Sequence, residues 1–136
     1  MQFNALVPEF SVSDITRSRA FYVDTLGFKI EYERPEAKFI YLSREGAQLM
    51  IEETNGHWAT GELEHPYGRG INFQFHADDV DTLLKSLEAK GIPLFRPTKE
   101  SWYRGGDTLY GVKEFLVQDP DGYLLRFAQD LGSKPA

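Results

Sequence analysis

The chain has 136 residues, 41% of them apolar and 14% aromatic, which is enough to bury one hydrophobic core and argues against disorder. It contains no cysteine, which excludes a disulfide scaffold, a thiolate zinc site and a cysteine nucleophile. Its net charge of −6 disfavours binding to nucleic acid, because an acidic chain repels the phosphate backbone.

The first half of the chain is expected to form one strand, one helix and three further strands. Apolar residues alternate through the first strand, with Leu6 and Phe10 on the face that packs under the helix. Ser13 and Asp14 can cap the helix, and Gly27 can end it. The predicted elements are a strand over 5–12, a helix over 15–26, and strands over 28–34, 38–43 and 47–53.

Residues 54–69 are polar and rich in turn formers, and we interpret them as a linker to a second set of elements. Apolar residues recur at helical spacing from Val80 to Leu87, and Asp79 can cap that helix. Residues 97–110 are expected to form a long loop. The predicted elements are a strand over 71–77, a helix over 80–90, and strands near 92–96, 111–118 and 123–129.

The two halves repeat the same order of elements and the same helix signals. The segment VSDI before the first helix and Gly27 after it correspond to ADDV and Gly91 in the second half. A repeat of about 65 residues with one helix and four strands predicts a tandem supersecondary unit. We therefore expect an α+β fold in which two βαβββ modules form curved mixed sheets around a cleft. The expected boundaries within one domain, 1–136, are a first module at 5–53, a linker at 54–69, a second module at 70–130 and a tail at 131–136.

Strand alternation separates the residues that pack under a helix from those that face the cleft. Polar groups that converge in the cleft must pair with one another, meet water or bind a ligand. Arg126 can neutralise Glu9 or Glu52 across the sheets, or the polar groups can serve a small-molecule site. The residues expected to face the cleft are Val7, Glu9, Met50, Glu52, Asn72, Gln74 and Arg126.

Three segments of the chain resemble the vicinal oxygen chelate superfamily, which includes glyoxalases, dioxygenases and bleomycin resistance proteins. They are FSVSD (10–14), RAFYVDTLGF (19–28) and DPDGYLLRF (119–127), and the resemblance extends over nearly the whole chain. It implies two βαβββ modules around a small-molecule cleft. The enzymes of this superfamily hold a divalent metal ion with His and Glu side chains on the inner strands.

The resemblance assigns each metal-ligand position of the superfamily to a residue of this chain. The two histidine positions correspond to Val7 and Asn72, and the carboxylate positions correspond to Arg126 and Met50. Valine and methionine offer a hard cation no suitable ligand atom, and a guanidinium group repels it. We therefore expect no metal, no other cofactor and no catalytic residue.

The altered metal positions, and the ending DPDGYLLR followed by AQ, are similar to the bleomycin resistance branch. This resemblance implies a homodimer that sequesters a planar antibiotic with a cationic tail, such as bleomycin. Aromatic rings would stack on the planar part, and acidic groups would attract the tail. The expected ligand-binding residues are Glu9, Phe39, Tyr41, Met50, Glu52, Trp58, Asn72, Gln74, Trp102, Tyr103 and Arg126.

Two other functions stay open, as does the question of whether the halves pair within one chain or between two. One is a metal-dependent lyase or dioxygenase with displaced ligands, for which His76 with Glu9 and Glu52 is the candidate set. The other is a binding module for an unrelated metabolite. The N-terminus lacks the features of a secretory signal, and no segment approaches the roughly 18 apolar residues of a membrane span. We expect a soluble cytoplasmic protein that binds neither membrane nor nucleic acid.

Overall fold

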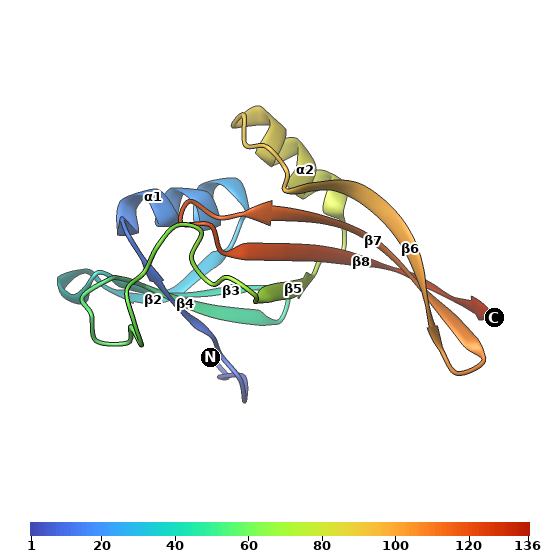
Figure 1. Cartoon of the computed structure of the whole chain (residues 1–136), viewed down its shortest axis with the longest axis horizontal. Coiled ribbons are helices and arrows are strands. Elements are labelled where there is room, and N and C mark those ends of the chain that lie inside the picture. Colours follow the sequence, from blue (N-terminus) through green and yellow to red (C-terminus); the bar gives the residue numbers. More distant parts are fainter.

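The computed structural model describes residues 1–136 and contains two α-helices, a π-helical segment, a 3₁₀ turn and eight strands (Figure 1). Neither helix has the length and apolar character needed to cross a membrane. The elements of the first half are β1 (Glu9–Val12), α1 (Ile15–Arg19), the π-helical segment η1 (Ala20–Thr25), β2 (Lys29–Arg34), the 3₁₀ turn η2 (Pro35–Ala37), β3 (Phe39–Arg44) and β4 (Ala47–Glu53). Those of the second half are β5 (Asn72–His76), α2 (Val80–Ala89), β6 (Arg96–Gly105), β7 (Thr108–Gln118) and β8 (Leu124–Pro135).

Each half forms its own four-stranded mixed sheet. The strand order is β1-β4-β3-β2 in the first sheet and β5-β8-β7-β6 in the second, so the two orders are equivalent. In each sheet the first strand pairs in parallel with the last, and the other pairs are antiparallel. The predicted α+β fold of two βαβββ modules is confirmed.

The first helix begins and ends at the residues that the sequence indicates. The side chain of Asp14 accepts hydrogen bonds from the backbone N–H groups of Thr16 and Arg17, which caps α1. The helix continues as η1, in which the N–H of Leu26 donates to the carbonyl of Phe21, five residues earlier. Gly27 follows at a φ of 76°, a conformation that favours glycine and ends the helix.

The second half differs from the prediction at its last three strands. The expected strand at 92–96 and the expected loop at 97–110 are wrong, because β6 and β7 form one long hairpin with Gly106 at positive φ in its turn. Residues 131–135, expected as a tail, continue β8. Figure 1 shows the far ends of these strands extending away from the rest of the molecule. In the first half, β1 starts at Glu9, and Leu6 is 84% exposed instead of packing under a helix.

One hydrophobic core joins the two halves through the faces of the sheets that carry the helices. The ring of Phe10 stacks on that of Tyr123 with centroids 4.2 Å apart, and it lies 4.8 Å from the ring of Phe73. Phe28 and Phe75 meet edge to face at 5.7 Å. All of these residues except Phe73 are buried, so both sheets direct one face into shared packing.

Hydrogen bonds between the first helix and the turn before β8 reinforce this junction. The hydroxyl of Tyr22, which is fully buried, donates to Asp119 at 2.7 Å. The backbone N–H of Ser13 donates to the carboxylate of Asp121 at 3.0 Å. The hydroxyl of Tyr123 donates to the carbonyl of Ser11 at 2.9 Å. Residues about a hundred positions apart in the chain thus satisfy one another's buried polar groups.

Asp119 makes this junction sensitive to pH. Burial raises the pKa of Asp119 from 3.8 to about 6, although the hydrogen bond from Tyr22 and two backbone N–H groups act in the opposite direction. Since the folded pKa lies above the unfolded one, the protonated form stabilises the fold, and this stabilisation is lost as the pH rises through about 6.

We expect the substitution Asp119→Asn to remove that dependence, because the amide oxygen still accepts the backbone N–H groups but does not ionise. Between about pH 4 and pH 7, the free energy of unfolding of the wild type should fall by about 2 kcal/mol relative to that of the variant. Urea unfolding at both pH values measures the difference. A gap between the two proteins that stays constant with pH would contradict the account.

Candidate ligand-binding site

The two faces of each sheet differ as alternation predicts. In β4, Leu49 and Ile51 are fully buried, whereas Met50 is partly exposed. In β8, Leu125 and Phe127 are buried, and the residues between and before them are partly exposed. The partly exposed residues lie on the concave face of each sheet, opposite the helices.

The concave faces line two separate hollows instead of one cleft enclosed by both halves. The first-half hollow has a volume of about 500 Å³, and the second-half hollow has a volume of about 390 Å³. No residue lines both. The first-half hollow is lined by Glu9, Tyr32, Arg34, Phe39, Met50 and Trp58. The second-half hollow is lined by Asn72, Phe95, Arg96, Pro97, Lys99, Ser101, Tyr103, Glu114, Leu116, Leu124 and Arg126.

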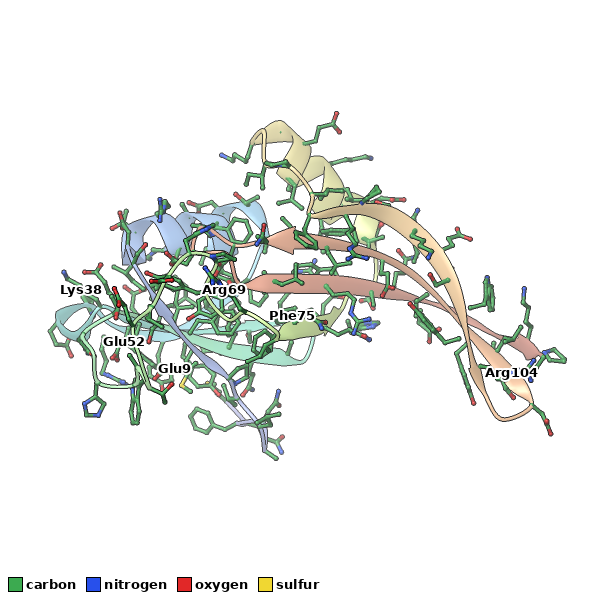
Figure 2. All side chains as sticks on the ribbon, in the orientation of Figure 1. Glu9, Lys38, Glu52, Arg69, Phe75 and Arg104 are labelled. Carbon is green, nitrogen blue, oxygen red and sulfur yellow. The ribbon has the colours of Figure 1, made fainter.

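The first-half hollow combines carboxylates with aromatic rings. Figure 2 shows Glu9 and Glu52 together beside the first sheet. Burial and the neighbouring carboxylate of Glu52 raise the pKa of Glu9 above its ordinary value. The guanidinium group of Arg34 lies 4.0 Å from the ring centroid of Phe39 and so covers part of this wall. Trp58, from the linker, is 62% exposed and completes the wall.

The second-half hollow is basic. Arg126 lies 3.8 Å from the carboxylate of Glu114, which also accepts a hydrogen bond from the hydroxyl of Tyr103 at 2.9 Å. The alternative in which Arg126 neutralises Glu9 or Glu52 is therefore wrong within one chain, since its carboxylate partner comes from the neighbouring strand β7.

Four of the expected ligand-binding residues lie outside both hollows: Tyr41, Glu52, Gln74 and Trp102. Tyr41 is buried, stacks on Tyr32 at 5.2 Å and donates a hydrogen bond to Gln48. Gln74 is exposed on the edge strand β5. Glu52 is half-buried beside the first-half hollow and accepts a hydrogen bond from Asn55.

Trp102 and Tyr103 were both expected to bind the ligand, but adjacent strand residues point to opposite faces. Tyr103 lines the second-half hollow, whereas the ring of Trp102 covers Gly111 and lies 4.0 Å from the Nζ atom of Lys134. Figure 2 shows Arg104, one residue further along, at the far end of this hairpin.

The sequence analysis missed several residues that line the hollows. They lie in or directly beside strands β2, β6 and β7. The sequence contained the information for β2. Alternation through the expected strand 28–34 places its even-numbered residues on one face, and Tyr32 and Arg34 are among them. For β6 there was no such signal, since the segment was interpreted as a loop. The missed residues include Tyr32 and Arg34 in the first half, and Phe95, Arg96, Lys99, Glu114 and Leu116 in the second.

The positions that correspond to metal ligands do not fit a metal ion. Arg126 brings a positive charge, and the carboxylate nearest to it is already shared with a tyrosine hydroxyl. Met50 and Asn72 line different hollows, and Val7 lies in the segment before β1. These side chains neither converge within the chain nor offer a set of hard donors.

The displaced set of His76 with Glu9 and Glu52 does not form either. His76 is exposed on β5, where its Nε2 atom lies 2.7 Å from the carboxylate of Asp78. Glu45 completes this exposed group and is itself bonded to Arg44 and to the backbone of Asp78. The histidine is therefore paired at the far edge of the sheet.

The sequence model of the Glyoxalase/Bleomycin resistance protein/Dioxygenase superfamily matches residues 4–127. The match covers most of the chain, and the two four-stranded mixed sheets are those of this fold. The chain belongs to this superfamily.

Relatives within the superfamily carry names from two functional classes. The chain is 29% identical to a lactoylglutathione lyase from Haemophilus influenzae, over 90% of each chain. It is 23% identical to a bleomycin resistance protein from Staphylococcus aureus, over 93% of this chain and 97% of the other. Among solved structures, TioX from Micromonospora sp. ML1 matches with a TM-score of 0.72 at 20% identity, over 95% of this chain and all of that one. This structural likeness shows the fold alone.

Proposed function

We propose that this chain is a metal-free small-molecule binding protein that sequesters a planar antibiotic with a cationic group, such as bleomycin. The observation that carries the proposal is the side chains at the four metal positions, Val7, Met50, Asn72 and Arg126, which cannot hold a divalent ion. Without a metal ion, the fold keeps its concave faces for binding but loses the chemistry that the ion supplies.

The first-half hollow supports binding of a planar cation. Tyr32 and Trp58 expose 38% and 62% of their surface, respectively, and such rings can stack on a flat ligand. A cation beside Glu9 and Glu52 would relieve the repulsion between the two carboxylates that contributes to the raised pKa of Glu9. Cation–π contact with the exposed rings would add about 0.5–2 kcal/mol.

A homodimer would complete the site, as the resemblance to bleomycin resistance proteins implies. Each hollow is lined by one half of the chain and is open on the side away from its sheet. The strands β1 and β5 are free edges, and the apolar residues just before them, Leu6 and Ile71, are exposed. We propose that β1 of one copy lies beside β5 of another, so that a first-half hollow faces a second-half hollow.

Calorimetric titration with metal-free bleomycin tests the binding function. We expect one drug molecule per chain and, in the variant with Glu9→Gln and Glu52→Gln, an affinity lower by at least about tenfold, equivalent to about 1.4 kcal/mol. Glu33→Gln is the matched control, because Glu33 is bonded to Arg19 outside the hollow. Absence of both heat and a thermal shift on adding the drug would exclude this ligand.

Sedimentation velocity tests the homodimer. We expect the wild-type protein to sediment as a dimer and the variant with Leu6→Asp and Ile71→Asp to sediment as a monomer, because charges at the two edges oppose burial in an interface. Both positions are exposed in the chain, so circular dichroism should show that the variant remains folded. A wild-type protein that stays monomeric at high concentration would contradict the proposed assembly.

A further inference from the structure

The second-half hollow concentrates positive charge in an acidic protein. Three cationic side chains line it, Arg96, Lys99 and Arg126, against one carboxylate, Glu114. The whole chain carries a net charge of −6, so the positive charge of this hollow has the opposite sign to the net charge of the protein. The first-half hollow has no such excess, because one carboxylate, Glu9, and one guanidinium group, Arg34, line it and Glu52 lies beside it.

The positive charges of this hollow are incompletely paired. Arg96 and Lys99 make no salt bridge. Arg126 approaches Glu114 only to 3.8 Å, and its Nε atom is buried without a hydrogen-bond partner. The carboxylate of Glu114 already accepts the hydroxyl of Tyr103.

The register of the sheet places the two guanidinium groups on either side of an apolar residue. Arg96 on β6 is opposite Leu116 on β7, and Leu116 is opposite Arg126 on β8. Two strand spacings separate the arginines, or about 10 Å between backbones. Leu116 and the neighbouring Leu124 and Phe95 offer an apolar floor, and Phe95 is 48% exposed.

We propose that the second-half hollow is an anion site that takes an organic anion, a carboxylate or a phosphate monoester, attached to an apolar body. Arg96 and Arg126 would hold the anionic group, because the planar guanidinium matches the oxygen pairs of both carboxylate and phosphate. Leu116, Leu124 and Phe95 would contact the apolar body. The proposal goes beyond the sequestering of a cationic drug, and it rests on the second-half hollow alone, which residues of one chain line.

Three naphthalene probes with the same ring system test the site. They are 2-naphthoate, 2-naphthyl phosphate and the neutral 2-naphthalenemethanol, each titrated into the wild-type protein by calorimetry. We expect at least one of the two anions to bind once per chain and at least about tenfold more tightly than the alcohol. The stronger of the two anions identifies the preferred group. Equal affinity for the alcohol and both anions, or no binding of either anion, would overturn the proposal.

Two variants locate the binding and separate it from the drug site. Arg126→Gln and Arg96→Gln should each weaken the anion by about tenfold and leave the alcohol unchanged. Arg96 is exposed, so its variant is informative even if the other fails to fold. Lys90→Gln, outside the hollow at the end of α2, is the control and should change nothing. Anion affinity that survives both arginine substitutions would overturn the proposal. The variant with Glu9→Gln and Glu52→Gln should lower the affinity for the drug and leave the affinity for the anion unchanged.

Discussion

The buried hydrogen bond between Tyr22 and Asp119 fixes how the two halves of the molecule meet. It joins the first helical segment to the turn before β8, and Ser13 with Asp121 forms a second link beside it. The stacked rings of Phe10 and Tyr123 fill the space behind these bonds. Because the faces that carry the helices are used in this junction, both concave faces must remain outside it, and each becomes a separate hollow.

The two hollows share one architecture and differ in charge. In the first, Glu9 and Glu52 stand near exposed rings, and in the second, Arg96 and Arg126 flank an apolar floor. Met50 in the first hollow and Arg126 in the second occupy equivalent positions of the repeat, opposite Glu9 and Gln74 respectively. The fold of the superfamily is retained, and the four positions that correspond to its metal ligands carry Val7, Met50, Asn72 and Arg126.

Local patterns in the sequence were sufficient to predict the repeat and the face of the sheet to which most strand residues point. Asp14 and Asp79 cap the helices as their spacing indicates, and alternation correctly orients Met50 and Arg126. Most of β7 was predicted as the strand 111–118, but β6 was missed because it is mostly exposed and lacks the apolar alternation of a half-buried strand. The separation of the hollows could not be predicted, because it depends on contacts between residues about a hundred positions apart, such as that of Phe10 with Tyr123.

The central claim is that this member of the superfamily binds ligands without a metal ion. Elemental analysis of protein purified without chelator tests it most directly, with Fe, Mn, Ni and Zn measured against protein concentration. The account predicts far less than one ion per chain, because Val7, Asn72, Arg126 and Met50 cannot supply a ligand set. One tightly held ion per chain, lost when His76 is replaced, would contradict it and favour a metal-dependent enzyme.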